Sequence, residues 1–264
     1  MELYVDRDSW LHRLDPRTKL AFTLAGAVLL LLTNSVWLIL GWLVAAHAIL
    51  LSARVPWARL RWVWRVMLPL TVLVPILWPL FYREGATLIA LGPVQITGLS
   101  LVRGVAVGLR IDALAFVWFV LLFATDQTRL IRGLVRLGLP YSWGLTAAIA
   151  LRYLPTLQDT YTTVSEAQQA RGLVLGRGHL LKAARAQLPI LVAVLIGALR
   201  ATDQLSLALQ ARAYNPRRPR TSYRELRLTP LDGLLLVGIA AFTLAYLGAR
   251  LALGFGASPV GFGS

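Results

Sequence analysis

Two arginines that close helical segments are the residues best placed to do chemistry with a partner. They lie in the motifs Ala170-Arg171-Gly172 and Ala211-Arg212-Ala213, each at the far end of a predicted helix. Helix-breaking residues follow both motifs, namely further glycines at 176 and 178 after the first and Asn215-Pro216 after the second. A guanidinium group is a planar fork of donors that suits carboxylates and helix C-termini in a partly buried groove. We therefore predict that protein partners hold this pair from the water side, with contact to lipid headgroups as the alternative.

The chain offers no catalytic constellation, no metal site and no cofactor site. A phosphate-binding P-loop needs a Gly-Lys-Ser/Thr sequence, whereas Lys19 and Lys182 follow Thr18 and Leu181. The histidines at 12, 47 and 179 are far apart and lack ligands at metal spacing, so each is expected to be a surface or interface side chain. No Gly-x-Ser-x-Gly elbow occurs. We predict that the chain is not an enzyme and that any ATP hydrolysis resides in partner subunits.

The composition is that of a membrane protein. Of 264 residues, 57% are hydrophobic and only 15% are charged, with a mean hydropathy of +0.65. Several apolar runs approach the roughly 20 residues that a helix needs to cross a bilayer. The basic residues, which give a net charge of +15, cluster between these runs. That is the pattern of the positive-inside rule and not of a nucleic-acid groove.

Five membrane-spanning helices are expected, at residues 20–32, 36–51, 63–82, 104–124 and 231–253. Three prolines should kink the third of these helices, and residues 83–101 form a Gly- and Pro-bearing connection to the fourth. With the basic clusters in the cytoplasm, the N-terminus lies inside and the C-terminus outside. The predicted fold class is an all-α integral membrane protein, multi-pass in the cell (inner or cytoplasmic) membrane, with about five transmembrane helices plus a cytoplasmic-side module of long coupling helices.

The segment between the fourth and fifth spans has a different character. Residues 1–124 hold the N-terminal region and four transmembrane helices, residues 125–229 form the arginine-rich coupling-helix module, and residues 230–264 form the last span and tail. Arginines 129, 132 and 136 share one face of a helix that should lie in the membrane interface. Two longer helices are expected at 142–171, bent near Pro155, and at 189–212. The runs 143–157 and 188–199 are shorter than a crossing and leave additional half-spans open.

Arg110 and Asp112 are charged residues within the fourth span. A charge at the centre of a membrane helix costs roughly 2.5–3.5 kcal/mol on insertion scales. Because the two residues are only two positions apart, their side chains cannot face each other on one helix. We expect Arg110 to extend toward the interface and Asp112 to pair with an arginine of a neighbouring helix. A role in ion movement is the alternative, but no further polar residues extend a path.

Four stretches of the chain, in order, resemble the transmembrane T component (EcfT or CbiQ type) of energy-coupling-factor (ECF) transporters. Leu14-Asp15-Pro16-Arg17-Thr18-Lys19-Leu20 is similar to the N-terminal signature of that family. Residues 150–155, with Arg152 and Pro155, resemble its Leu-Arg-Phe-Leu-Pro stretch. Residues 167–172 and 207–214 resemble its two Ala-Arg-Gly motifs. The ordered set covers most of the chain and is specific, whereas any one stretch alone is weak.

Two positions depart from the family pattern. Ala213 stands where the family usually has glycine, and Thr125-Asp126 stands where a Thr-Thr pair is common. The alanine weakens the expectation of a left-handed cap after Arg212, although the arginine itself is kept.

The resemblance implies a scaffold that couples two cytoplasmic ABC ATPase subunits to a small membrane subunit, which captures a vitamin or a metal ion. It assigns docking into grooves of the two ATPases to Arg171 and Arg212, with Ala170, Gly172, Ala211 and Ala213 beside them. The helices between would relay the motion driven by nucleotide. The sequence of this chain does not identify the substrate, because another polypeptide selects the substrate in that family. The alternative function is a stand-alone secondary transporter or channel, which predicts polar groups near mid-membrane and broken helices.

Overall fold

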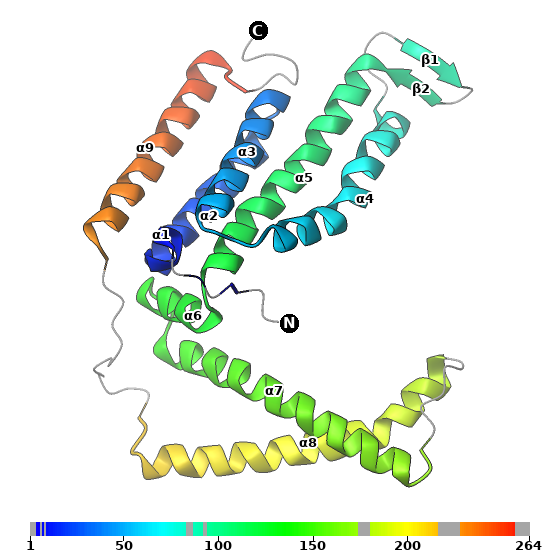
Figure 1. Cartoon of the computed structure of the whole chain (residues 1–264), viewed down its shortest axis with the longest axis vertical. Coiled ribbons are helices and arrows are strands. Elements are labelled where there is room, and N and C mark those ends of the chain that lie inside the picture. Colours follow the sequence, from blue (N-terminus) through cyan, green and yellow to red (C-terminus); the bar gives the residue numbers. More distant parts are fainter. Residues whose placement is uncertain are drawn as a thin grey trace. The chain divides into compact units, whose positions relative to one another are not determined.

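The computed structural model describes residues 4–5, 7, 9–82, 87–91, 94–173, 180–215 and 228–256, and the fold is built almost entirely from helices (Figure 1). In order, the elements are α1 (Trp10–Arg13), α2 (Pro16–Leu32), α3 (Val36–Ser52), α4 (Trp57–Phe81), β1 (Thr87–Leu91), β2 (Val94–Thr97), α5 (Gly98–Ala124), α6 (Gln127–Arg136), α7 (Tyr141–Ala170), α8 (Leu180–Ala211) and α9 (Pro230–Leu253). The chain separates into unit 1, which comprises Met1–Gly133 and Leu226–Ser264, and unit 2, which comprises Leu134–Glu225.

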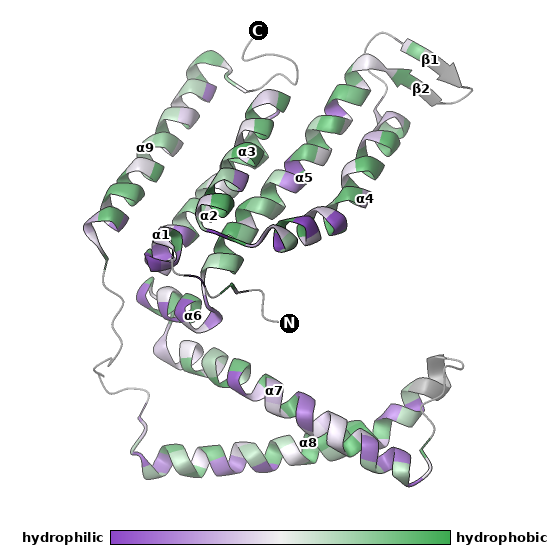
Figure 2. Ribbon diagram, in the orientation of Figure 1, coloured by the Kyte–Doolittle hydropathy of each residue, from purple (hydrophilic) through white to green (hydrophobic). Residues whose placement is uncertain are grey.

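The membrane character of the chain lies in long apolar helices. Within the described residues, four segments are long and apolar enough to cross a membrane: α4, α5, Ala184–Ala211 of α8, and α9. Helices α2 and α3 have 17 residues each, at the lower limit of about 17 residues for a crossing. Hydrophobic residues predominate along α2, α3, α5 and α9 and along the later part of α4, whose beginning is largely hydrophilic (Figure 2). The expected all-α membrane fold is confirmed, and α8 adds an apolar segment that the sequence reading assigned to the coupling module.

Helix α5 is the centre of unit 1 and packs against α2, α3 and α4. Its side chains Phe116, Val117 and Phe123 are fully buried. Small residues bring α4 close, since a Cβ atom added at Gly104 would lie only 2.9 Å from the Cα of Pro75. The tight fit between α4 and α5 therefore depends on the absence of a side chain at this glycine.

The connection between α4 and α5 is more ordered than the sequence predicts. Strands β1 and β2 pair antiparallel, with Leu91 opposite Val94. Helix α5 then begins at Gly98, earlier than the predicted start at residue 104, because Thr97 and Ser100 form a capping box. The hydroxyl of Thr97 accepts from the backbone N–H of Ser100 at 3.1 Å. The Gly- and Pro-bearing connection at 83–101 thus contains two short strands and the first residues of α5, which the sequence reading did not assign.

Unit 2 is built from two long helices that pack against each other, α7 and α8. The hydroxyl of Tyr161 on α7 donates to Oε1 of Gln187 on α8 at 2.8 Å. Pro155 and Pro189 both lie inside their helices. The prediction that Pro189 begins the second of these helices was therefore wrong, because the alanine-rich residues before it are strong helix formers and extend α8 back to Leu180.

Candidate functional site

Both arginine motifs end their helices in the same backbone turn. After α7, the N–H of Leu173 donates to the carbonyl of Gln168 at 3.0 Å, and that of Gly172 donates to Gln169 at 2.9 Å. These two hydrogen bonds are the Schellman pattern, which satisfies helix carbonyls that would otherwise lack a donor. Gly172 takes the left-handed conformation with φ +92° that the turn requires.

The turn after α8 repeats both of these hydrogen bonds. The N–H of Tyr214 donates to Leu209 at 2.9 Å, and that of Ala213 donates to Gln210 at 2.8 Å. Ala213 adopts the left-handed conformation with φ +52° although it is not glycine. The departure at this position therefore does not abolish the cap, contrary to the expectation from its sequence, but it places an L side chain where the backbone disfavours one.

Both turns leave the guanidinium group exposed. Arg171 and Arg212 occupy the same position in their turns, the last one before the left-handed residue, and both are exposed to solvent. Across the described part of the chain, neither side chain has a hydrogen-bond or ion-pair partner. Within unit 2, the C-terminal ends of α7 and α8 lie at opposite sides of the helix pair (Figure 1). The structure thus presents two equivalent arginines at two separate places.

The other two residues singled out in this region lie within α7. Arg152 is exposed, and Pro155 is exposed one turn further along the helix. The structure does not bring either residue together with the arginine turns.

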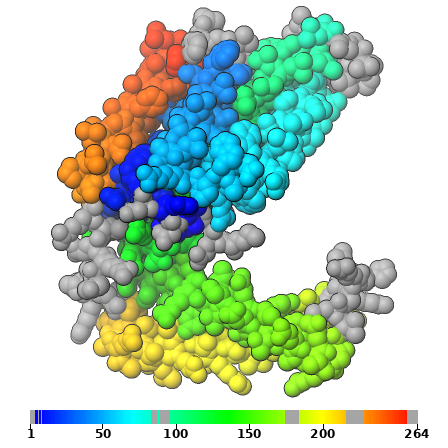
Figure 3. Space-filling view, in the orientation of Figure 1, coloured from blue at the N-terminus to red at the C-terminus, as the bar shows by residue number. Residues whose placement is uncertain are grey.

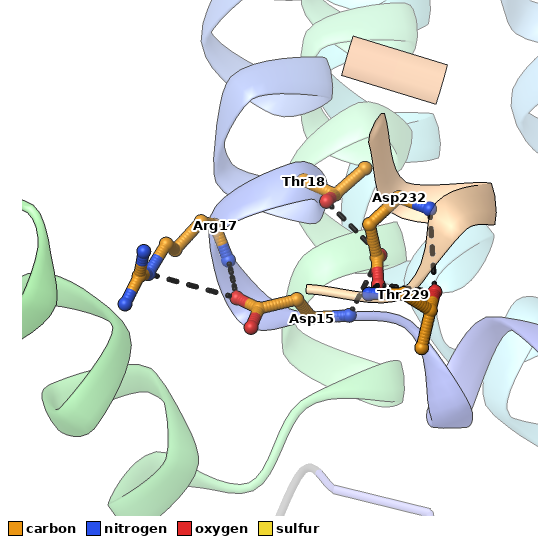
Figure 4. Close-up of polar contacts among 5 residues, drawn as sticks. All are labelled: Asp15, Arg17, Thr18, Thr229 and Asp232. Atoms are coloured by element: carbon orange, nitrogen blue, oxygen red, sulfur yellow. Dashed lines mark hydrogen bonds and ion pairs between the residues drawn. The ribbon is translucent and has the colours of Figure 1, made fainter. Parts of the chain in front are cut away.

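The N-terminal signature forms the start of α2. Asp15 caps the helix, because its Oδ1 accepts from the backbone N–H of Arg17 at 2.9 Å, and Pro16 fills the first helical position. Nε of Arg17 lies 3.9 Å from the same oxygen. The close-up shows these contacts on one side of a second, deeper carboxylate, that of Asp232 (Figure 4).

Asp232 at the start of α9 links the two ends of the sequence in space. Its side chain is fully buried, and Oδ1 accepts from the backbone N–H of Asp15 at 2.9 Å and from the hydroxyl of Thr18 at 3.0 Å. Oδ2 accepts from the backbone N–H of Thr229 at 2.9 Å and from its hydroxyl at 2.6 Å. The carboxylate therefore caps α9 and satisfies donors of the signature at the same time (Figure 4).

Sequence reasoning missed this residue. Thr229-Pro230-Leu231-Asp232 has the form of a capping box with proline at the first helical position, so the local signal was present. The pairing with Asp15 and Thr18, more than two hundred residues earlier in the chain, has no local signal.

Lys19 and Pro16 connect the signature to α5 and α6. Nζ of the buried Lys19 donates to the carbonyl of Ala124, the last residue of α5, at 2.8 Å. A Cβ atom added at Gly133 on α6 would lie 3.0 Å from Cβ of Pro16. The signature thus acts as a junction at which α2, α5, α6 and α9 are fixed to one another within unit 1.

The charged residues of the fourth span are both used in contacts between helices. Arg110 donates to the carbonyl of Thr33 and, at 2.9 Å, to Oδ1 of Asn34 in the turn between α2 and α3. Asp112 accepts from the hydroxyl of Thr71 on α4, with its two oxygens at 2.8 and 2.9 Å. The expectation that Asp112 pairs with an arginine was wrong, because a hydroxyl one helix away satisfies the buried carboxyl group.

The histidines that the structure describes form no metal site. Nε2 of His47 accepts a hydrogen bond from the indole N–H of Trp64 at 2.9 Å, and the ring centre of His47 lies 4.1 Å from that of Phe116. The side chain of His12 is buried and bonds Ser9 at 2.7 Å. His12 is therefore not at the surface, and His179 lies outside the described residues. Within the described residues, no three His, Cys, Asp or Glu side chains gather as metal ligands would.

Comparison with known proteins identifies the family. A family model described as cobalt transport protein (CbiQ) matches residues 7–223. The chain belongs to the CbiQ family. The match includes the signature around Asp15 and both arginine turns.

Curated relatives of this CbiQ-family chain are similar over nearly their whole length. The chain is 30% identical to the energy-coupling factor transporter transmembrane protein EcfT of Lactococcus lactis subsp. cremoris (strain MG1363), covering 92% of this chain and 95% of the relative. It is 31% identical to the protein of the same name from Thermosediminibacter oceani, covering 89% and 94%. The EcfT protein of Listeria innocua serovar 6a is 30% identical, covering 91% and 94%. The CbiQ-family chain is thus a multi-pass T component of an ECF transporter and a member of a complex with other subunits.

Proposed function

We propose that this T component couples two cytoplasmic ATPase subunits to a small substrate-capturing membrane subunit, for uptake of a vitamin or a metal ion across the cell membrane. The observation that carries the proposal is the pair of matched turns at Arg171 and Arg212. Two equivalent arginines at opposite sides of unit 2 fit two ATPase subunits of the same fold. The orientation with the N-terminus in the cytoplasm belongs to this proposal.

The chemistry of the turns supports docking. Each arginine ends a helix that is closed by two backbone hydrogen bonds, so little backbone freedom is lost when a groove closes around the guanidinium. The planar fork can pair with a carboxylate or with helix C-terminal carbonyls in the groove. In such a buried pair, truncation of one partner typically costs about 2–5 kcal/mol of binding free energy.

The surface of α8 supports a membrane partner. Leu188, Leu191, Leu195 and Leu199 recur at helical spacing along one face, and each is 53–61% exposed. A continuous apolar stripe of this kind needs an apolar partner. We assign it to the small substrate-capturing subunit, so that one end of each long helix contacts an ATPase and the stripe contacts the capture subunit.

We further propose that α7 and α8 swing when the ATPases close on nucleotide and thereby tilt the capture subunit. The contact between Tyr161 and Gln187 joins the two helices, since the tyrosine hydroxyl donates to Oε1 of the glutamine at 2.8 Å. Both side chains are long, so cysteines at these two positions are too far apart for a direct disulfide and need a bifunctional thiol reagent. A Tyr161→Cys/Gln187→Cys variant joined by a reagent with a disulfide in its spacer should transport slowly, and reduction of the spacer should restore the rate. Unchanged transport in the cross-linked protein would contradict the swing but would leave the docking proposal standing.

A stand-alone secondary transporter is less well supported. Such a protein needs polar groups that line a site near mid-membrane. In the described part of unit 1, the two charged groups of the fourth span instead bond to neighbouring segments, Asp112 to Thr71 on α4 and Arg110 to Asn34 in the turn between α2 and α3.

The docking proposal is tested by reversing the two charges. Co-expression with the ATPases and the capture subunit, followed by affinity purification through this chain, should recover all subunits for the wild type. The double variant Arg171→Glu/Arg212→Glu should lose both ATPases while it keeps its membrane insertion. The matched control, Arg185→Glu/Arg200→Glu, changes two exposed arginines of α8 by the same charge and should retain them. Retention of both ATPases by the first variant would refute the docking assignment.

A further inference from the structure

Unit 1 contains an apolar cavity between α9 and the helices α1, α2 and α3. Its volume is about 410 Å³, and it is partly open to the surroundings of the protein. Side chains and backbone from five helices line it, including Phe22, Gly26, Trp42, Leu234, Gly238 and Phe242. The rings of Trp42 on α3 and Phe242 on α9, which both line it, contact each other edge to face with their centres 6.1 Å apart. The space-filling view shows α9 alongside α3 on this side of the unit (Figure 3).

Apart from Trp42, the few polar side chains in the lining have their polar atoms already bonded to protein. The hydroxyl of Thr18 donates to Asp232, and the amine of Lys19 donates to the carbonyl of Ala124. The hydroxyl of Thr243 donates to the carbonyl of Ile239 at 2.7 Å, and the indole of Trp10 donates to Ser52 at 3.3 Å. A cavity that offers so few polar partners does not hold water favourably, so its occupant is apolar.

Hydrogen bonds hold α9 to α2 at both ends of the cavity. At one end Asp232 bonds Asp15 and Thr18. At the other end the hydroxyls of Thr33 and Tyr246 bond each other, and Arg250 donates to the carbonyl of Leu32. A transmembrane helix of another subunit is about 10 Å wide and would have to break these contacts to enter. The occupant is therefore narrower than a helix.

The length of the cavity matches one leaflet of a bilayer. Along α2 the lining runs from Thr18 to Leu29, and along α9 from Leu234 to Thr243. At a rise of about 1.5 Å per residue these stretches are roughly 14–17 Å long. Half of a hydrocarbon core is about 15 Å. The indole of Trp10, which is 49% exposed, marks the polar end, as interfacial tryptophans do.

We propose that this cavity is a binding site for one acyl chain of a membrane phospholipid, inserted between α2 and α9 with its headgroup at the Trp10 end. The surrounding bilayer always contains this ligand, and the acyl chain fills a cavity that would otherwise stay empty. The bound acyl chain completes the packing of α9, which in the described structure contacts α2 far more than it contacts any other helix. This inference stands on unit 1 alone and does not depend on the ATPase-docking proposal.

The glycines of α9 supply a test with matched controls. A Cβ atom added at Gly238 meets nothing within 4 Å, so a larger side chain there extends into the cavity without striking the backbone. Gly248 on the same helix also has open space around a new Cβ atom but does not line the cavity. Gly238→Phe should therefore occlude the site, and Gly248→Phe should leave it open. Ala25→Phe fills the cavity from the opposite wall, on α2, should Gly238→Phe fail to fold.

The probe is a phosphatidylcholine with a diazirine at the middle of one acyl chain, incorporated in vesicles of unlabelled phosphatidylcholine that contain the full chain. After illumination, labelled peptides are mapped by mass spectrometry. Wild type and Gly248→Phe should concentrate label on the cavity-facing residues of α2 and α9. The cavity-filling variants should reduce that label roughly tenfold, because an overpacked site excludes the chain. Label spread evenly over all lipid-facing helices, or label that a folded cavity-filling variant leaves unchanged, would overturn the proposal.

Discussion

Replacement of Asp232 by alanine should destabilise unit 1 more than any other single carboxylate substitution in the signature junction. The change removes an acceptor from two buried donors, the N–H of Asp15 and the hydroxyl of Thr18, and also removes the cap of α9. A buried donor left without its partner costs roughly 1–3 kcal/mol, and loss of a helix cap costs about 1 kcal/mol. The expected fall in the free energy of unfolding is therefore at least about 3 kcal/mol. Asp232→Asn keeps the size and one oxygen acceptor, so about half that loss is expected.

The assay is equilibrium unfolding of the purified full chain in mixed micelles with increasing SDS, followed by circular dichroism. A double-mutant cycle with Thr18→Val isolates the hydroxyl–carboxylate contact and should give a coupling of about 1 kcal/mol. Asp203→Ala is the control, because Asp203 is exposed on α8 and has no partner in the described structure. A value for Asp232→Ala within about 0.5 kcal/mol of the wild type, as for an ordinary surface change, would refute the reasoning.

Three further stability changes are expected in the same assay. Ala213→Gly should stabilise the protein by about 1 kcal/mol, because it removes the backbone strain of an alanine in the left-handed conformation. Gly172→Ala should destabilise the protein by a similar amount for the same reason. If both variants changed the stability in the same direction, the matched turns would be contradicted. Gly104→Ala should cost about 1–3 kcal/mol because the new Cβ meets the backbone of Pro75, whereas Gly41→Ala, with nothing within 4 Å, should be neutral or stabilising. Lys19→Met should cost about 1–3 kcal/mol because it leaves a buried carbonyl of α5 without its donor, and no change would show that water replaces the amine.

The helices were predictable because their signals are local. Apolar runs of span length located α4, α5 and α9, and Asp15-Pro16 marks the start of α2 by cap chemistry. The helix boundaries that were misplaced are those at which a local signal was missed or misread. Gly98 begins α5 because of a Thr97 cap that had gone unrecognised, and Pro189 lies inside α8 although proline is usually read as a helix start.

Contacts between distant residues were not predictable from one sequence. Nothing near Asp112 indicates Thr71 as its partner, since the pairing depends on how closely α4 approaches α5 at Gly104 and Gly108. The two arginine turns could be located, but the pair of Schellman hydrogen bonds that they share could not be predicted, because alanine at 213 argues against a left-handed residue. The sequence thus located the two arginine turns, whereas the partners of Asp112 and the role of Asp232 came only from the tertiary structure.

The distance in sequence between Asp15 and Asp232 has a consequence for biosynthesis. The N–H of Asp15 is separated from its carboxylate acceptor by 217 residues. At ordinary translation speeds of about 5–20 residues per second, the ribosome reaches that acceptor roughly 10–40 s after it has made the donor. Until α9 has been inserted into the bilayer, the start of α2 lacks its contacts with Asp232. A nascent chain arrested before this final helix should therefore be a marked target for membrane proteases.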